Sequence, residues 1–302
     1  MHDIIIVGAG PAGLTASVYA LRAGKTVLVI EKNGFGGQIA FSPKVENIPG
    51  TQQISGAEFA DKLTEQAINL GADMELENVT DIKKANDIFE VYTEEGSTYK
   101  AKAVILALGV KHRTLGLDGE NELIGNGISF CAVCDGAFYQ GQEVAMVGGG
   151  NSALQEALLL SEVCKKVTVI QDLADFTGEK KLADALMAKE NVQVHFNTLV
   201  TGYIAENGEL KGIEIENRST AVKKAIAVDG AFLAVGLVPE NEPFEEHASL
   251  NSWGYFDSDE NCLTKTEGLF VAGDCRSKTI RQVVTAAADG ATAAMAACRF
   301  LD

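Results

Sequence analysis

Residues 4–13 read IIIVGAGPAG, and this stretch decides the fold. Its apolar start predicts a strand buried on both faces, as in a parallel sheet. The glycines predict a tight turn into a helix over 14–23, and a second apolar run, 27–30, ends at Glu31. The pattern indicates a right-handed βαβ unit.

Each glycine of this turn has a separate physical role. Gly8 permits the sharp bend, Gly10 lets a pyrophosphate approach the backbone, and Gly13 lets the helix pack closely on the strand. The helix start offers free N–H groups to phosphates. Glu31 is placed to accept hydrogen bonds from a ribose diol. We therefore expect a dinucleotide site rather than a merely structural turn.

The same plan occurs a second time. An apolar run at 144–147 precedes the turn 148–153, a helix is expected over 154–164, and the strand 167–170 ends near Asp172. Two such units predict an α/β chain with two Rossmann-like, three-layer ββα dinucleotide-binding domains.

Three further apolar runs end in glycine or in glycine and aspartate, at 101–109, 231–236 and 268–274. The first two follow their Gly-rich turns at the same distance, which places one strand of each domain. The second domain is therefore expected to be inserted into the first. The expected limits are 1–113 with 244–302 for the first domain, 117–241 for the second, and 113–117 and 241–244 for a two-strand hinge.

Charge and hydropathy argue against nucleic acids and membranes as partners. The 302 residues carry a net charge of −17, which does not favour a nucleic-acid groove or an anionic membrane surface. No apolar run approaches the roughly 20 residues of a membrane span. The start, Met1-His2-Asp3, does not resemble a signal peptide, so we expect a cytoplasmic enzyme.

Two cysteines lie in the run Cys131-Ala132-Val133-Cys134-Asp135. Their spacing allows a small disulfide ring, and a helix start there would favour a thiolate. A zinc site would require a second Cys/His pair, and the other four cysteines are scattered. We expect a redox dithiol rather than zinc ligands or inert core residues, and no metal site.

These parts form a minimal relay for electron pairs. A nicotinamide gives two electrons as hydride, and a dithiol/disulfide couple also exchanges two. A flavin is the cofactor that can connect them.

The chain resembles the low-molecular-weight (bacterial-type) thioredoxin reductases, class II pyridine nucleotide-disulfide oxidoreductases, over essentially its full length. The matching stretches are Gly8 to Gly13, Gly36-Gly37-Gln38, residues 45–50, Cys131 to Gly136, Gly148 to Ala153, residues 273–276 and residues 281–287. The resemblance implies that FAD lies across the first domain. The expected FAD residues are Gly8, Gly10, Pro11, Ala12, Gly13, Glu31, Lys32, Gly37, Gln38, Asn47, Gly109, Gly273, Asp274, Arg281, Gln282 and Val283.

The resemblance also implies the catalytic roles. Cys134 resembles the thiol that faces the flavin, Cys131 the thiol that attacks the disulfide of thioredoxin or a thioredoxin-like protein, and Asp135 the general acid/base. Asp135 could instead be a helix-start acid. A homodimer and a rotating nucleotide domain are implied as well.

The sequence departs from the family at the second nucleotide. The expected pyridine-nucleotide residues are Gly148, Gly150, Asn151, Ser152, Ala153 and Asp172. NADPH-using relatives carry arginines for the 2′-phosphate after the second strand of this unit, whereas residues 171–177 here contain none and Asp172 stands at one such position. A carboxylate repels a 2′-phosphate but accepts from a free 2′-OH. We expect NADH to be favoured, with NADPH or a donor such as ferredoxin or a deazaflavin as alternatives.

Three rival functions are possible, one of them the reductase half of a peroxiredoxin system, which usually carries an extra N-terminal thioredoxin-like segment. A flavin reductase of the ferredoxin–NADP⁺ type shares the two-domain plan but has no active CxxC. A flavin redox sensor would show no fast turnover.

Overall fold

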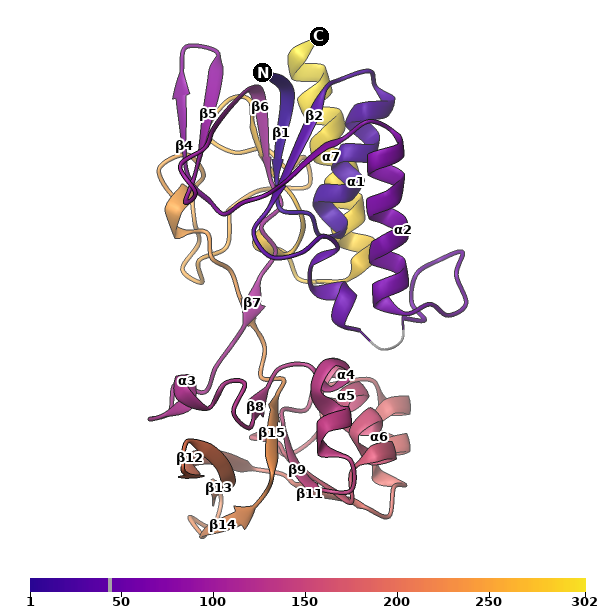
Figure 1. The fold of residues 1–302 in the computed structure, drawn as a ribbon, viewed down its shortest axis with the longest axis vertical. Coiled ribbons are helices and arrows are strands. Elements are labelled where there is room, and N and C mark those ends of the chain that lie inside the picture. Colours follow the sequence, from indigo (N-terminus) through magenta and orange to yellow (C-terminus); the bar gives the residue numbers. More distant parts are fainter. Residues whose placement is uncertain (43–44) are drawn as a thin grey trace. The chain divides into compact units, whose positions relative to one another are not determined.

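The computed structural model describes residues 1–42 and 45–302, without the side chains of Phe41, Val133 and Cys134. The chain forms two compact units (Figure 1). Unit 1 comprises 1–111 and 238–302, and unit 2 comprises 112–237. Each is an α/β unit built on a parallel sheet, so the predicted fold class is confirmed.

Unit 1 has a seven-stranded sheet in the order β3-β2-β1-β6-β5-β4, with β17 also paired to β6. Strands β1, β2, β3, β6 and β17 are parallel, and β4, β5 and β6 form antiparallel pairs. The bounds are β1 His2–Val7, β2 Val27–Glu31, β3 Asp73–Leu76, β4 Val79–Ala85, β5 Ile88–Thr93, β6 Thr98–Leu106 and β17 Leu269–Val271.

The helices of unit 1 are α1 Pro11–Arg22, α2 Gly56–Asn69 and α7 Val283–Leu301. They gather on one side of the sheet (Figure 1), and α1 packs along α7. Alanines on both helices make this close packing possible, because they add little bulk to the shared core. The other face of the sheet is covered by a second core that includes Phe89, Phe244 and Phe256. Short 3₁₀ turns occur at η1 Gly37–Phe41, η3 Glu242–Phe244 and η4 Gly273–Cys275.

Unit 2 has a five-stranded parallel sheet in the order β11-β10-β9-β15-β8 and a separate antiparallel sheet β12-β13-β14. In Figure 1 the helices α4, α5 and α6 lie on one side of the parallel sheet. The bounds are α3 Glu120–Leu123, β8 Ile128–Ser129, α4 Ala132–Asp135, η2 Gly136–Tyr139, β9 Glu143–Val147, α5 Asn151–Val163, β10 Lys166–Ile170, α6 Lys180–Met187, β11 Val192–His195, β12 Thr198–Glu206, β13 Glu209–Asn217, β14 Lys223–Ala227 and β15 Gly230–Leu233.

Two chain segments connect the units. They contain the short strands β7 Lys111–His112 and β16 Leu237–Val238, which pair with each other. The amide of Arg113 also donates to the carbonyl of Gly236 at 2.9 Å. The binding role of each unit and the motion at this connection stay predictions.

Several element ends differ from those expected. Helices α1 and α5 begin at Pro11 and Asn151, three residues earlier than predicted. The N-cap of each helix is a glycine, Gly10 or Gly150, so the first helical turn starts directly after it. Strand β6 ends at Leu106, and Gly109 already has a φ of +64°. The expected strand 268–274 divides into β17 and η4.

None of the helices in the described residues is both long enough and apolar enough to cross a lipid bilayer.

Candidate active site

The first Gly-rich turn joins β1 to α1 in the expected conformation. Gly8 has a φ of +103°, which favours glycine. A Cβ added at Gly13 would lie 1.8 Å from the Gly8 carbonyl oxygen. The first turn of α1 therefore packs against the end of β1 with no room for a side chain at this position. The loop at Gly37 covers this turn, because a Cβ there would lie 2.9 Å from the Gly10 Cα.

Glu31 is fixed beside this turn by backbone N–H groups. Its Oε2 accepts from the Ala9 amide at 2.8 Å, and its Oε1 accepts from the Asn33 amide at 3.0 Å. The side chain is buried. An ionised carboxylate has about four acceptor positions, so each oxygen retains capacity for a ribose hydroxyl.

Asp274 supplies a second acid close to the turn. It lies in η4, where a Cβ on Gly273 would approach the Ala12 side chain of α1 to 2.8 Å. Its Oδ1 is buried and has no hydrogen-bond partner among the described residues. Burial raises the pKa of this carboxyl above its ordinary value. A buried acceptor of this kind indicates a hydrogen-bond donor beyond the described residues, which a bound ligand could supply.

The loop before α7 is tied to Asp274. The Arg281 Nε donates to the Asp274 carbonyl at 3.2 Å, and its guanidinium lies 4.1 Å from the centre of the Tyr255 ring. The side-chain oxygen Oε1 of the next residue, Gln282, accepts from the side-chain Nδ2 of Asn47 at 2.9 Å. Sequence reasoning missed Tyr255, since no motif marks it.

Two expected FAD residues have other contacts. The ammonium of Lys32 pairs with Glu240 at 2.7 Å. The side-chain Nε2 of Gln38 donates to the Val110 carbonyl at 3.3 Å. This bond holds the loop at Gly37 to the chain that follows β6. Their roles toward a cofactor stay predictions.

The redox segment lies in unit 2, between β8 and η2. Cys131 is disulfide-bonded, and α4 begins at the next residue. The Cys134 side chain lies outside the described part of the chain, so its pairing with Cys131 stays a prediction. The four remaining cysteines, Cys164, Cys262, Cys275 and Cys298, are free and buried. Burial raises the pKa of Cys275 to about 12, as expected of packing residues.

Ser129 joins the acid of this segment to the first cysteine. Its Oγ donates to Asp135 Oδ2 at 2.5 Å and accepts from the Cys131 amide at 3.0 Å. The Asp135 amide in turn donates to the Cys131 carbonyl at 3.1 Å. Sequence reasoning missed Ser129, because a serine two residues before a CxxC pair has no distinctive signal.

The second Gly-rich turn repeats the geometry of the first. Gly148 has a φ of +130°, and Ala153 is buried at the position that must be small. The Gly149 carbonyl accepts from the amides of Thr177 and Gly178 at 2.8 and 3.0 Å. The loop after β10 therefore lies against this turn.

Asp172 is exposed in this loop, two residues beyond the end of β10. Its Oδ2 lies 3.6 Å from Nη1 of Arg218, in the connection between β13 and β14. Sequence reasoning did not place Arg218 here, because residues so far apart in the chain show no spacing signal.

A family model described as "Pyridine nucleotide-disulphide oxidoreductase" matches residues 2–290. The chain belongs to this family. It is 37% identical over 302 residues to "Thioredoxin reductase" of Bacillus subtilis, covering 100% of this chain and 95% of that protein. It is 40% identical over 300 residues to "34.2 kDa protein in rubredoxin operon" of Clostridium pasteurianum, covering 99% and 97%.

A solved structure of Lactococcus lactis thioredoxin reductase has a TM-score of 0.96 at 32% identity, covering 100% of this chain and 99% of that one. The predicted resemblance is confirmed, and the chain is an oxidoreductase. Membership in the pyridine nucleotide-disulphide oxidoreductases implies a flavin and a pyridine nucleotide.

The residues of unit 1 fit a flavin dinucleotide. A Gly-rich turn, a carboxylate held at that turn and an unpartnered buried oxygen on Asp274 are the groups that pyrophosphate, ribose and further hydroxyls would meet.

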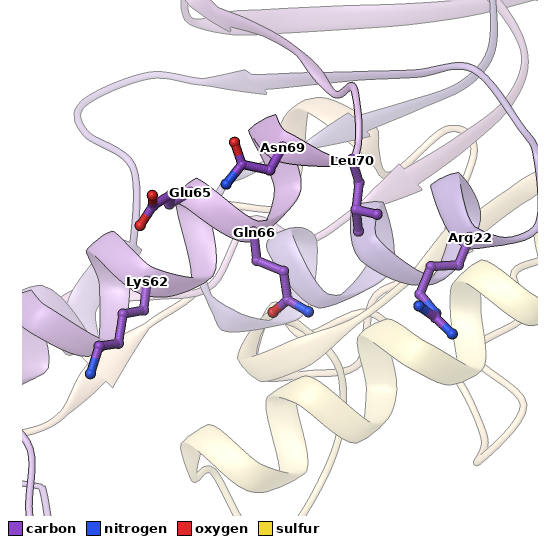
Figure 2. A pocket seen from close by; sticks show the side chains of 6 residues that line it. All are labelled: Arg22, Lys62, Glu65, Gln66, Asn69 and Leu70. Carbon is purple, nitrogen blue, oxygen red and sulfur yellow. The ribbon is translucent and has the colours of Figure 1, made fainter.

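A separate surface hollow of about 480 Å³ lies between the last residue of α1 and the second half of α2 (Figure 2). It is lined by Arg22, Lys62, Glu65, Gln66, Asn69 and Leu70. Arg22 ends α1, whereas the Gly-rich turn precedes its first residue, Pro11. The hollow is therefore at the opposite end of this helix from the dinucleotide turn and is not part of that site.

Proposed function

We propose that the chain is an FAD-dependent thioredoxin reductase that favours NADH. It passes two electrons through the Cys131–Cys134 disulfide to the disulfide of thioredoxin or a thioredoxin-like protein. The observation that carries this proposal is the disulfide-bonded Cys131 next to an acid that Ser129 holds in place.

Asp135 has the chemistry that the disulfide exchange requires. When the disulfide is reduced, the departing thiolate must gain a proton, and a carboxyl group fixed nearby can supply one. The Ser129 hydroxyl orients Asp135 through Oδ2. Cys131 is then the thiol that attacks the partner disulfide, and Cys134 the one that faces the flavin.

When bound, FAD supplies a two-electron carrier between a nicotinamide and a disulfide. The first Gly-rich turn would hold its pyrophosphate and Glu31 its ribose. Asp274, through its free Oδ1, would accept from a further hydroxyl. The loop at Arg281 and Gln282 is fixed through Asp274 and Asn47, which would keep it next to the ring system.

Asp172 supports NADH as the donor. Its carboxylate is exposed beyond β10, where it can accept from a free 2′-OH and repels a 2′-phosphate. Arg218 keeps NADPH as the second candidate, because its guanidinium lies at the same place. This exposed ion pair is weak, so a phosphate could compete for Arg218.

Three further features belong to the same proposal. Residues 1–113 and 244–302 bind FAD, residues 117–241 bind the pyridine nucleotide, and the two connecting segments allow the second domain to rotate. The enzyme acts as a cytoplasmic homodimer.

Anaerobic stopped-flow spectroscopy tests the donor. Flavin bleaching is followed with NADH, with NADPH and with reduced ferredoxin. Faster and tighter reduction by NADH supports the proposal, whereas preference for NADPH or ferredoxin replaces only the donor. Thioredoxin reduction is then compared with a Cys134→Ser control. A wild type no faster than this control would contradict the reductase and favour a redox sensor.

A further inference from the structure

Glu156 connects α5 to the redox segment. Its Oε2 accepts a hydrogen bond from the Ala132 amide at 3.3 Å, and Ala132 directly follows Cys131. One turn further along α5, the Leu160 side chain lies 3.2 Å from where a Cβ on Gly136 would be. Helix α5 therefore contacts both ends of the segment that carries the cysteine pair, and α4 and α5 are neighbours in Figure 1.

This carboxyl group is partly buried, and no cation among the described residues pairs with it. Burial raises the pKa of Glu156 to about 7, and the Ala132 amide only partly opposes this. The described ionisable groups on elements that pack against α5 form neither a hydrogen bond nor an ion pair with the Glu156 carboxyl. They are Asp135 of α4, Tyr139 of η2, Lys180, Lys181 and Asp184 of α6, Glu143 of β9 and Lys166 of β10.

An acid without a counter-charge is expensive to bury. A hydrophobic residue at this position would avoid that cost. The chain nevertheless places a carboxyl against the first amide of the redox segment. Groups that titrate near neutrality beside reactive side chains are candidates for a functional role.

We propose that Glu156 is a positioning residue of the redox pair, which holds the Ala132 amide and takes up a proton when the adjacent disulfide is reduced. This inference rests on the proposed function, since it takes Cys131 and Cys134 as the redox pair.

The proton balance is as follows. Breaking the S–S bond takes two electrons and, to give one thiol and one thiolate, one proton. The new thiolate adds a negative charge to the segment whose Ala132 amide bonds Glu156, and like charges disfavour each other. Glu156 then binds a second proton from solvent, so that the segment gains two electrons and two protons without a net change of charge.

The sign of the pH effect follows from this coupling. At low pH Glu156 is neutral in both redox states and has no influence on the thiolate. At higher pH its negative charge opposes thiolate formation, so reduction becomes less favourable than in a chain without that charge. The variant Glu156→Gln keeps a carbonyl acceptor for the Ala132 amide and removes the titration.

The experiment measures the redox equilibrium of the cysteine pair in the full chain with bound FAD. Samples are equilibrated with reduced and oxidised dithiothreitol between about pH 6 and about pH 8.5, alkylated, and scored by mass for the peptide that contains both cysteines. Glu162→Gln is the matched control, because Glu162 lies on the same helix, is exposed and pairs with Lys189.

We expect Glu156→Gln to coincide with the wild type at about pH 6 and to favour the dithiol by roughly threefold or more at about pH 8.5. Glu162→Gln should follow the wild type throughout. Curves for Glu156→Gln that stay parallel to the wild type at every pH overturn the inference and leave the reductase intact. Failure to trap a Cys131–Cys134 disulfide in any sample overturns both proposals.

A second measurement does not depend on the variant folding. Infrared difference spectra of the wild type and of Glu162→Gln, taken on reduction at about pH 8, should both gain a protonated-carboxyl band. Absence of this band from both spectra contradicts proton uptake by Glu156.

Discussion

The Ser129 hydroxyl donates to Asp135 at 2.5 Å and accepts from the Cys131 amide at 3.0 Å. One side chain at the end of β8 therefore fixes both the acid and the backbone of the first cysteine. Rotation of the Asp135 carboxyl would break this contact, so we expect Ser129 to set the direction from which Asp135 would deliver a proton in its proposed role as general acid.

Replacing Ser129 with alanine should slow thioredoxin reduction. A hydrogen bond of this kind contributes roughly 0.5–1.5 kcal/mol, so we expect kcat to fall by up to roughly tenfold with the flavin spectrum unchanged. Steady-state assays with thioredoxin measure this. Ser161→Ala is the control, because the Ser161 hydroxyl donates only to the Leu158 carbonyl within α5. Equal rates for both variants would show that Ser129 has no role in catalysis.

Replacing Gly13 with alanine should disrupt unit 1. The added Cβ would lie 1.8 Å from the Gly8 carbonyl oxygen, and this neighbour is backbone that cannot rotate away. We expect a loss of roughly 3 kcal/mol or more in the free energy of unfolding and a loss of bound flavin. Denaturant titration and flavin absorbance measure these quantities. Gly34→Ala, where a Cβ meets nothing within 4 Å, should change neither, and a fully stable, yellow Gly13→Ala protein would contradict the prediction.

The fold could be predicted because its signals are local. The runs at 4–7 and 144–147 and the glycines that follow specify strand, turn and helix within a few residues of one another. The three-residue error at the starts of α1 and α5 arose because apolar periodicity begins after the first helical turn, whereas the N-cap is a backbone feature of Gly10 and Gly150.

The site could be predicted only where it follows a motif. The cysteine pair and Asp135 are contiguous, and Glu31 follows its turn at a typical distance. Ser129, Glu156 and Arg218 act through contacts that depend on how β8, α5 and the β13–β14 connection pack. No spacing in the sequence encodes such contacts.

Replacing Asp172 with arginine should shift the donor preference toward NADPH. The change removes a charge that repels a 2′-phosphate and adds a group that can bond it, next to Arg218. We expect the KM for NADPH to fall roughly tenfold or more while that for NADH rises. Initial rates with both donors measure this. Asp175→Arg makes the same charge change three residues further on and serves as the control. If it gives the same shift as Asp172→Arg, general electrostatics rather than a specific site explains the preference.

Glu156 should also make the stability of unit 2 depend on pH. Its pKa is raised from an ordinary 4.5 to about 7 in the folded chain, so the unfolded chain loses this proton first. The stabilisation is complete below about pH 4.5 and is lost as the pH rises through about 7. Allowing for partial exposure, we expect the free energy of unfolding of the wild type to fall by on the order of 1–2 kcal/mol relative to Glu156→Gln over this interval.

Hydrogen exchange of the amides in α4 and α5 measures this difference. Comparing the two proteins at the same pH cancels the intrinsic pH dependence of exchange. If the difference in protection between the wild type and Glu156→Gln is the same at about pH 5 and at about pH 8, Glu156 does not titrate between these values. A similar pH-dependent difference in Glu162→Gln would assign the effect to helix charge rather than to the buried carboxyl group.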